Sequence, residues 1–331
     1  MEKVLVTGAT GFLGEYLVKQ LLSDGYQVFA LGRKEEAGKK LEGLGAIFCK
    51  ADFTNQKECE PYFVEVDYVV HAGALSTVWG SWESFYNANV LGTRNVCELC
   101  ERYGVKRLIY ISSPSIYSAK KHRFDIKESE YDVKNELNYY IKSKILSEQV
   151  IREFDEKGLY TVVIRPRGLI GVGDTSLMPR ILNANDKIGI PLFNLGQNYV
   201  DITCVENVAY AASLSIKAED VKGEVFNLTN GEPMQFKVIL EMFLKAMGKE
   251  PHYRKLPFSL LYGVASVLET IYKAFRLKEE PTLTKYTVCT LAFSQTLDIS
   301  KARKQLKYEP VITLSEGIEN YGKWWKQQNK D

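Results

Sequence analysis

The segment "VLVTGATGFLGEYLVKQLL", residues 4–22, constrains the fold of this chain more than any other stretch. It passes from a β-branched run through three glycines, Gly8, Gly11 and Gly14, into a helical pattern. Gly8 permits a tight turn, Gly11 lets the backbone approach a pyrophosphate, and Gly14 allows the helix to pack on the strand. The N-terminus of the helix then faces the anion. The segment predicts the first strand and helix of a dinucleotide-binding domain, with a purely structural glycine turn as the alternative.

Short β-branched runs alternate with helical patterns through the first half of the chain. The runs are KVLVT, QVFAL, AIFCKA, DYVVHA, KRLIYIS and YTVVIR. This alternation predicts an α/β fold with a Rossmann-type, doubly wound parallel sheet and crossover helices. After residue 165 the rhythm loosens, and later segments are mostly helical. We therefore expect an NAD(P)-binding domain at 1–165 plus about 200–228, and a smaller, mostly helical substrate-binding domain at about 166–199 and 229–331.

The end of the second predicted strand, in "QVFALGRK", bears on the choice between NAD and NADP. A carboxylate at this place accepts the ribose 2′-hydroxyl of NAD, but this chain has Gly32, Arg33 and Lys34. Because Arg33 can donate bidentate hydrogen bonds to a 2′-phosphate, the sequence favours NADP, and NAD stays open. Arg33 as a solvated loop charge is the alternative. Asp52, after the third strand, either accepts from the adenine amino group or caps a helix over residues 54–57.

Two tyrosines precede two lysines in "LNYYIKSKILSEQ", residues 137–149. Side chains four residues apart share one face of a helix, so Tyr140 lies over Lys144. With 20 tyrosines in the chain, about two Tyr-x-x-x-Lys pairs are expected by chance, and the other pair is Tyr117 with Lys121. The basic run after Tyr117 indicates an exposed loop. Only Tyr140 and Lys144 therefore have a helix to hold their spacing.

Charge and cysteine usage narrow the class of protein. A net charge of +2 with scattered basic residues argues against a nucleic-acid partner. The start, MEKVLVTG, reads directly as a strand without a signal peptide, so a cytoplasmic protein is expected. The six cysteines lie in apolar or helical stretches, and no metal site is predicted. For the close pair Cys97 and Cys100, a helical pattern favours packing over metal binding or redox chemistry.

The most apolar segment is LPFSLLYGVASVLETIYKAF, residues 256–275. Its uncharged core, Leu256 to Leu268, is shorter than the roughly 20 residues that a membrane span needs. Apolar residues from Leu260 to Phe275 fall at helical spacing on one side. We expect no membrane span but a helix that covers a pocket or core, with a weak interfacial membrane contact as the alternative.

Six motifs occur in order along the chain and together indicate a family. They are Thr7–Gly14, His71–Ala74, Asn89 in "NVLGTRNV", Ser113 in "ISSPSIY", the Tyr140/Lys144 pair and "IRPRGLIGVGD". In this combination the chain resembles an extended short-chain dehydrogenase/reductase over nearly its full length. Within that family, "HAGALSTVWGSWESFYNANVLGTRNV" and the apolar C-terminal half are most similar to the 3β-hydroxysteroid dehydrogenase group and its bacterial 2-alkyl-3-oxoalkanoate reductase relatives.

The resemblance implies catalytic roles for four residues. Tyr140 is the acid/base on the substrate oxygen, and Ser113 hydrogen-bonds that oxygen. Lys144 binds the nicotinamide ribose and favours the phenolate of Tyr140 by lowering its pKa. Asn89 steadies the site, unless it merely caps or packs its helix. Rivals of Ser113 that the alternation of side chains leaves open are Ser112 and Ser115.

The resemblance also implies a cofactor surface. His71 belongs to the wall of that surface and is not a general base, while Arg167 touches substrate or a diphosphate or else makes a surface ion pair. The residues expected to contact the cofactor are Thr7, Gly8, Thr10, Gly11, Phe12, Leu13, Gly14, Arg33, Asp52, Phe53, His71, Ala72, Gly73, Ala74, Tyr140, Lys144 and Pro166.

Three functions compete at this stage. The leading one is an NADP-dependent oxidoreductase that interconverts a secondary alcohol and a ketone on a hydrophobic, steroid-like or fatty-acyl-like small molecule. A nucleotide-sugar epimerase shares the Ser/Tyr/Lys site, whereas Ser113-Pro114-Ser115 in place of Thr-Asp-Glu disfavours a dehydratase. The third is a nucleotide-sensing protein without chemistry. A closed apolar chamber above Tyr140 would favour ketone reduction, and an open groove with arginines an epimerase. A homodimer is expected from the resemblance.

Overall fold

A seven-stranded parallel sheet forms the centre of the chain. The computed structural model describes residues 1–277 and 279–329. The order of the strands across the sheet is β12-β7-β5-β4-β1-β2-β3, and every neighbouring pair is parallel. The prediction of a doubly wound parallel sheet is confirmed. The strands are β1 (Lys3–Thr7), β2 (Gln27–Gly32), β3 (Ile47–Lys50), β4 (Tyr68–His71), β5 (Arg107–Ile111), β7 (Thr161–Pro166) and β12 (Glu224–Leu228).

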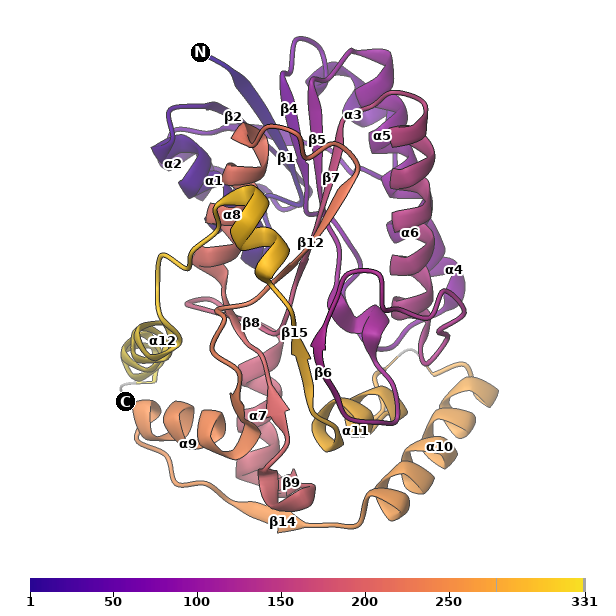
Figure 1. Ribbon diagram of the computed structural model, residues 1–331, viewed down its shortest axis with the longest axis vertical. Coiled ribbons are helices and arrows are strands. Elements are labelled where there is room, and N and C mark those ends of the chain that lie inside the picture. The colour runs from indigo at the N-terminus through magenta and orange to yellow at the C-terminus, as the bar shows by residue number, and fades with distance from the viewer. Residues whose placement is uncertain (278, 330–331) are drawn as a thin grey trace.

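Helices cover both faces of this sheet (Figure 1). One face packs against α1 (Phe12–Ser23), α2 (Glu35–Gly43) and α8 (Val205–Lys217). The other packs against α3 (Gln56–Cys59), α5 (Gly92–Arg102) and α6 (Tyr139–Glu156). Side chains alternate along β1, so Val4 and Val6 pack in the core on the α1 face and Leu5 packs in the core on the α5 face. Burial on both faces explains why the strands read as continuous apolar runs.

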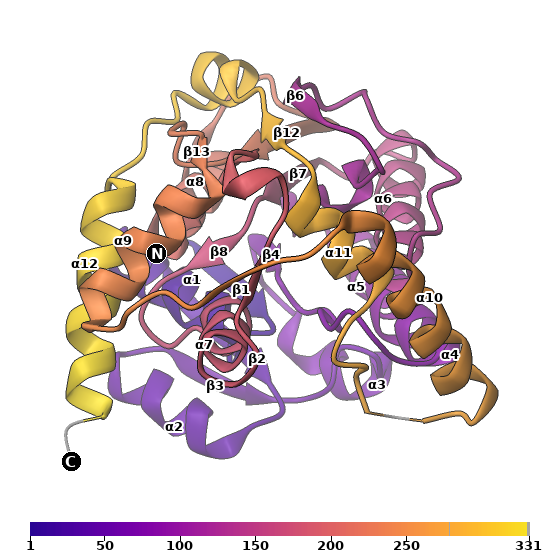
Figure 2. The same cartoon turned by 90° about the horizontal axis from the view of Figure 1, so that it is seen from below.

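Smaller sheets and helices lie at the carboxyl ends of these strands (Figures 1 and 2). A four-stranded sheet has the order β13-β10-β15-β6, and two strand pairs are β8 with β11 and β9 with β14. The strands are β6 (Arg123–Ile126), β8 (Leu169–Ile170), β9 (Ile190–Leu192), β10 (Tyr199–Val200), β11 (Thr203–Cys204), β13 (Met234–Gln235), β14 (Tyr253–Lys255) and β15 (Gln295–Leu297), and the helices are α7 (Leu177–Lys187), α9 (Phe236–Met247), α10 (Phe258–Ala274), α11 (Lys285–Ala292) and α12 (Leu314–Gln328). The predicted domain boundaries stay a prediction, although α8 and β12 do join the large sheet.

Three short helical segments lie before α5 and after β5. A four-residue helix, α4 (Trp82–Phe85), continues without a break into a π-helical turn, η2 (Tyr86–Leu91), and then into α5. A 3₁₀ turn, η3 (Pro114–Tyr117), follows β5. The remaining short turns are η1 (Glu60–Tyr62), η4 (Asn194–Gly196) and η5 (Ala302–Leu306).

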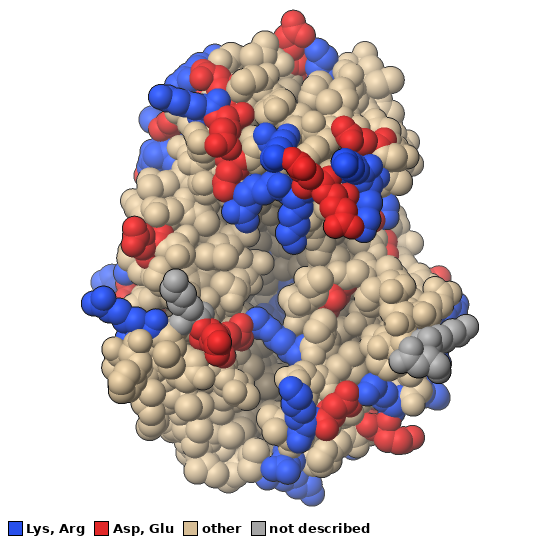
Figure 3. Space-filling view, turned by 180° about the vertical axis from the view of Figure 1, so that it is seen from behind, with Lys and Arg blue, Asp and Glu red and all other residues tan. Residues whose placement is uncertain are grey.

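The helix α10 leaves its apolar stripe in solvent. It packs on α11 through the side that carries the buried residues Ala265 and Glu269. Exposed on the opposite side are Leu260, Val264, Val267, Ile271 and Phe275. The prediction that this stripe covers a pocket or core is therefore wrong for these five residues. Figure 3 shows an almost uncharged surface over this part of the molecule. In the part of the chain that the structure describes, no helix is long and apolar enough to cross a membrane.

All six cysteines are buried free thiols. Cys97 and Cys100 lie in α5, in the core between that helix and the sheet, so the prediction that they pack is confirmed. Burial raises the pKa of the Cys97 thiol well above its ordinary value. Within residues 1–277 and 279–329, no group of three or more His, Cys, Asp or Glu side chains is arranged to hold a metal ion.

Candidate active site

The glycine turn after β1 forms a shallow cradle at the N-terminus of α1. Gly8 has a φ of +71°, and a Cβ there would lie 2.7 Å from the backbone of Gly73. Gly14 packs so closely on the backbone of Gly8 and Ala9 that a Cβ would overlap it. Gly11 caps α1 without a side chain, which leaves the first amides of the helix open. This cradle, which a side chain would fill, suits a pyrophosphate.

Beside the cradle, His71 lies in the middle of a chain of hydrogen bonds that runs from Asn89 O to Gly73 N. Thr93 Oγ1 donates to Asn89 O, so it accepts from His71 Nε2. His71 Nδ1 then accepts from Thr7 Oγ1, which itself accepts from Gly73 N. Burial and the nearby charge of Lys144 lower the pKa of His71 to about 3. His71 is thus a neutral imidazole with both nitrogens used, which agrees with its interpretation as wall and not as base.

Phe53 holds the same wall from the side of β3. A Cβ on Gly73 would lie 2.7 Å from the Phe53 ring, and one on Gly92 would lie 2.6 Å from it. The ring also packs edge-on against His71, with 5.4 Å between the centroids. Phe53 therefore fills the space between β4 and α5 and needs glycine on both sides.

Arg33 directly follows β2, and its side chain is 75% exposed. Its Nη1 lies 3.1 Å from Asp52 Oδ2. The other oxygen of Asp52 accepts from the amide and the hydroxyl of Thr54. Partial burial raises the pKa of Asp52, but the bonds from Thr54 and Arg33 outweigh it and lower the pKa below its ordinary value. Asp52 thus holds the turn before α3, but it is not the N-cap of that helix, which begins at Gln56 after Asn55, two residues later than the capping interpretation placed it.

Tyr140 lies in the first turn of α6, which Asn138 caps through its side-chain oxygen. Burial raises the pKa of Tyr140 to about 12, and a hydrogen bond with Ser113 lowers it in part. The Phe85 ring from α4 lies 6.3 Å away, centroid to centroid. Ser113 and Tyr140 therefore meet between the end of β5 and the start of α6, as the sequence predicted for the pair that holds a substrate oxygen.

Lys144 is buried beneath Tyr140. Its Nζ donates to Tyr110 Oη at 2.8 Å and to Ile111 O at 2.9 Å, both on β5. Burial lowers the pKa of Lys144 to about 7, against the opposing effect of Glu148. The Lys144 ammonium is bonded to Tyr110 and Ile111, and its expected effect on the pKa of Tyr140 stays a prediction.

Of the two rivals of Ser113, Ser112 faces elsewhere, whereas Ser115 is hydrogen-bonded to Ser113 itself. Ser112 is buried and donates to Glu148 Oε1, on the side of β5 that faces α6. Ser113 Oγ donates to Ser115 Oγ at 3.0 Å and accepts from the amide of Ser115, so the pair caps η3. Of the three serines, Ser113 is the one that lowers the pKa of Tyr140, so it stays the candidate for the substrate oxygen.

Asn89 is an anchor in the π-helical turn. Its Oδ1 accepts from Leu75 N at 2.7 Å, and its Nδ2 donates to Leu75 O and to Ser143 Oγ. Ser143 in turn donates to the carbonyl of Tyr140. Asn89 thus ties the loop after β4 to the first turn of α6 and has no amide hydrogen left for a substrate. It positions Tyr140 and is not in a place to act on a reacting atom.

Sequence reasoning missed a buried ion pair under the site. Arg165 on β7 bonds Glu148 through Nε and Nη2, and its Nη1 contacts Tyr117 Oη and Glu128 O. Tyr117 Oη donates to Asn227 Oδ1 at 2.7 Å. The expectation of an exposed loop at Tyr117 is therefore wrong, because this tyrosine ends η3 facing inward and the basic run begins only after it. No signal in the local sequence separates Arg165 from a surface arginine.

Arg167 follows β7 and is 7% exposed. Within the described part of the chain no ion pair or hydrogen bond engages its guanidinium, and Nε is buried without a partner. Burial lowers the pKa of Arg167 despite the nearby Tyr286 and Asp201. Of the two interpretations made from the sequence, a surface ion pair is excluded by these contacts. Pro166, the preceding residue, is buried at the end of β7.

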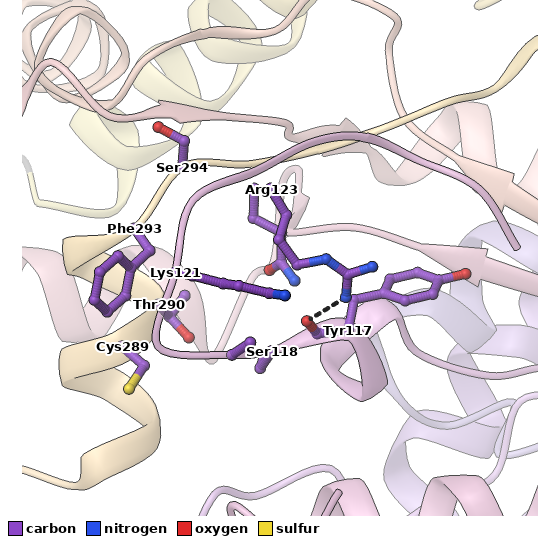
Figure 4. A pocket seen from close by; sticks show the side chains of 10 residues that line it. Tyr117, Ser118, Lys121, Arg123, Cys289, Thr290, Phe293 and Ser294 are labelled. Atoms are coloured by element: carbon purple, nitrogen blue, oxygen red, sulfur yellow. Dashed lines mark hydrogen bonds between the residues drawn. The ribbon is translucent and has the colours of Figure 1, made fainter. Parts of the chain in front are cut away.

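The surface has a hollow between the two parts of the molecule and a separate pocket near η3. Figure 3 shows the molecule hollowed between the part with the large sheet and the smaller part. A separate narrow pocket lies between η3 and α11, where Lys121 and Thr290 point inward (Figure 4). Tyr140 is not among the residues that line it. This pocket therefore does not decide between a closed chamber and an open groove at Tyr140.

Comparison with known proteins gives a consistent result. Residues 4–229 match the family described as the NAD dependent epimerase/dehydratase family. The chain is 35% identical to the uncharacterized protein YbjS of Escherichia coli (strain K12), covering 99% of each chain. It is 30% identical to a 2-alkyl-3-oxoalkanoate reductase of Stenotrophomonas maltophilia (strain K279a), covering 96% of this chain and 97% of the relative. The solved structure of UDP-glucuronic acid 4-epimerase from Bacillus cereus in complex with NAD superposes with a TM-score of 0.77 at 21% identity, over 99% of this chain and 100% of the other, and supports the fold.

Proposed function

Because the chain belongs to the NAD dependent epimerase/dehydratase family, as an extended short-chain dehydrogenase/reductase, we propose that it is an oxidoreductase that interconverts a secondary alcohol and a ketone on a largely apolar substrate. The observation that carries the proposal is the placement of Ser113, just after β5, and of Tyr140 and Lys144, at the start of α6, at the carboxyl edge of the sheet. Ligands of such sheets bind at that edge. Likeness to a 2-alkyl-3-oxoalkanoate reductase over nearly the full length supports the substrate class.

The residues present divide the work of a ketone reduction. When bound, a nicotinamide cofactor supplies the hydride. Ser113 holds the carbonyl oxygen, and Tyr140, which is protonated at neutral pH because its pKa is raised, delivers a proton to that oxygen. Asn89 and Ser143 fix the first turn of α6, so the hydroxyl of Tyr140 is held in one place. Lys144, directly below, is the residue that would hold the nicotinamide ribose.

The cradle fits a dinucleotide, and we propose that NADP is preferred to NAD. Arg33 is exposed just after β2, and among the described residues its guanidinium bonds with Asp52 alone. A 2′-phosphate would compete with one carboxylate oxygen for this guanidinium and offers more acceptor oxygens. Asp52 keeps its bonds from Thr54 in either case.

Turnover assays separate the proposed function from the alternative. NADPH consumption should follow the addition of a 2-alkyl-3-oxoalkanoate or a 3-oxosteroid, and Tyr140→Phe should abolish it. UDP-glucose and UDP-glucuronic acid, followed by NMR, should stay unchanged. Epimerisation of either sugar without net cofactor consumption would contradict the proposal and support the epimerase.

Two further parts of the proposal come from the sequence analysis, the homodimer from the family resemblance and the location from the sequence itself. We expect a homodimer, which light scattering on a sizing column tests directly. We also expect a cytoplasmic location, which fractionation of cells that express the protein would check.

A further inference from the structure

We infer that the outer face of α10 is a docking surface for a membrane, and that it lies flat on a bilayer that contains anionic lipids. This face is formed by exposed apolar residues of the helix and its C-cap, namely Leu260, Val264, Val267, Ile271 and Phe275. Contact with the surface of a bilayer does not require the length of a membrane span. The inference stands on the helix and its surroundings and does not depend on the proposed function.

The polarity of α10 is reversed relative to an ordinary surface helix, which turns its charged residues outward. Its acidic residue, Glu269, is buried, accepts from the amide of Lys285 at 2.7 Å and lies 3.4 Å from the Lys285 ammonium. The Lys273 ammonium lies 5.4 Å from the centre of the Tyr139 ring, on the side of the helix that faces the protein. The outer face of this 17-residue helix is therefore uncharged over about 25 Å.

Contacts on the inner side hold α10 in place at both ends. Trp79 Nε1 donates to Leu277 O at 3.2 Å, and the Trp79 ring packs edge-on against Tyr272 with 6.0 Å between the centroids. At the other end, the rings of Phe258 and Phe293 lie 5.1 Å apart, centroid to centroid. Figures 1 and 2 both show α10 at the outer edge of the molecule. The apolar stripe is thus fixed facing outward as a preformed surface.

The exposed charges around α10 are all positive. Arg254 and Lys255 precede the helix, and Lys273 and Arg276 lie at its C-terminal end. Within the described part of the chain none of these four belongs to an ion pair, and residues 252–277 contain no exposed acidic side chain. Basic residues beside an apolar helix face are attracted to anionic lipid headgroups while the apolar residues enter the boundary of the acyl chains. The charge and the polarity of this surface therefore fit the same partner.

The same charges argue against a second copy of this chain as the occupant. In a two-fold dimer a surface meets the identical surface of its partner. Antiparallel helices would bring Arg254 and Lys255 against Lys273 and Arg276, and parallel helices would bring each pair against itself. Cations would face cations in both arrangements, whereas an anionic bilayer neutralises them.

The first experiment measures binding of the full chain to vesicles. Vesicles contain phosphatidylcholine alone or with about 30% phosphatidylglycerol, and the bound fraction is determined by flotation. Wild type should bind the anionic vesicles, and Val267→Glu should bind them at least about tenfold more weakly, because it places a carboxylate on the apolar face. Val64→Glu is the matched control and should bind as wild type, since Val64 is 51% exposed in the turn after η1, against 60% for Val267. Equal binding by wild type and Val267→Glu would overturn the docking surface.

Removal of positive charge tests the choice of lipid. Lys273→Gln combined with Arg276→Gln should weaken binding to anionic vesicles roughly 20-fold, because each basic residue near such a surface contributes about a factor of five. Lys39→Gln combined with Lys40→Gln, at exposed lysines of α2, changes the net charge equally and should leave binding as in wild type. Equal losses in the two variants would show attraction by net charge alone and would overturn the role of α10.

A polarity-sensitive dye reports which segment meets the bilayer. All six native cysteines are buried, so a maleimide dye is directed to an introduced exposed cysteine. The emission of dye on Leu260→Cys and on Ile271→Cys should move to shorter wavelength when anionic vesicles are added, since both positions enter a less polar medium. Dye on Val64→Cys should not respond. Constant emission at both α10 positions would contradict the proposed orientation.

Light scattering distinguishes a second copy from a bilayer. Val267→Glu should have the mass and the melting temperature of wild type, because the side chain that it replaces faces solvent. Conversion of a dimer to a monomer by Val267→Glu, with no vesicle binding by wild type, would assign the outer face of α10 to a second copy and refute the bilayer. Absence of vesicle binding with an unchanged mass would refute it as well. None of these measurements uses turnover, so their failure would leave the proposed function untouched.

Discussion

The most informative single change is Tyr140→Phe, which removes one oxygen from the centre of the site. Within the described residues the change removes at most an interaction with Ser113, so the free energy of unfolding should change by no more than about 1 kcal/mol. Turnover should nevertheless fall by about 10²- to 10⁴-fold, since that is the usual contribution of a positioned acid or base. Cofactor binding should be retained, because the cradle and Lys144 are untouched.

The pKa of Tyr140 also predicts how the two directions of the reaction depend on pH. Reduction needs the protonated phenol, and a pKa of about 12 keeps it protonated throughout the accessible range, so Tyr140 itself should add no pH dependence to kcat/KM for reduction from pH 6 to 9. Oxidation needs the phenolate, which at pH 7 is roughly 1 part in 10⁵. The rate of oxidation should therefore rise roughly tenfold per pH unit until bound cofactor and Lys144 bring on a plateau.

Rates in both directions between pH 6 and 9 test this reasoning. Tyr139→Phe is the matched control, since Tyr139 is the neighbouring residue, is partly exposed and contacts the Trp82 ring. It should behave as wild type. Tyr117→Phe is not a neutral control, because it removes the bonds to Asn227 and Arg165. If Tyr140→Phe kept more than about half of wild-type turnover with chemistry rate-limiting, the assignment of Tyr140 as acid/base would be wrong.

Four further changes have expected outcomes. Arg33→Ala should weaken NADPH about tenfold or more and leave NADH unchanged in fluorescence titrations, and equal losses would count against an NADP-specific role. Lys144→Ala should lower both turnover and cofactor affinity, and a loss of turnover alone would argue against contact with the ribose. Glu148→Gln should reduce the free energy of unfolding by about 3 to 5 kcal/mol in urea melts, because Arg165 is left as an unpaired buried charge, and a change under 1 kcal/mol would disprove the pairing. His71 has a pKa of about 3 in the folded chain and about 6.5 in the unfolded chain, so its contribution to the free energy of unfolding is complete above pH 6.5 and falls by about 1.4 kcal/mol per pH unit towards pH 3. The free energy of unfolding of wild type relative to His71→Gln should therefore drop by about 2 kcal/mol between pH 7.5 and 5.0. A constant difference would contradict a neutral buried imidazole.

Local sequence signals were sufficient where one segment determines its own structure. The glycine turn of Gly8, Gly11 and Gly14 is built as the strand–turn–helix pattern predicts. Alternating β-branched runs predicted the parallel sheet, since each strand buries both faces. Tyr140 and Lys144 do share the start of one helix.

Features that depend on distant segments were not accessible in this way. The bond of Lys144 to Tyr110 joins a helix to a strand 34 positions away in the sequence, and no spacing rule predicts which neighbour an ammonium selects. Arg165 and Arg167 look alike in "IRPRG", yet only the first meets an acid. The stripe on α10 has the periodicity of a buried face, but periodicity does not reveal whether another element covers it.

The π-helical turn at η2 fixes the rotational phase between two halves of one continuous helix. Residues of α4 before it, Trp82 and Phe85, meet the tyrosines at the start of α6, while Thr93 after it meets His71. Each residue of a helix turns the chain by about 100°, so deleting one residue within Tyr86–Leu91 would swing one half around relative to the other. Either the Phe85 contact with Tyr140 or the Thr93 contact with His71 would then be lost. The number of residues in Tyr86–Leu91 is therefore more constrained than their identity, because a deletion rotates all contacts on one side of the turn, whereas a substitution changes one side chain.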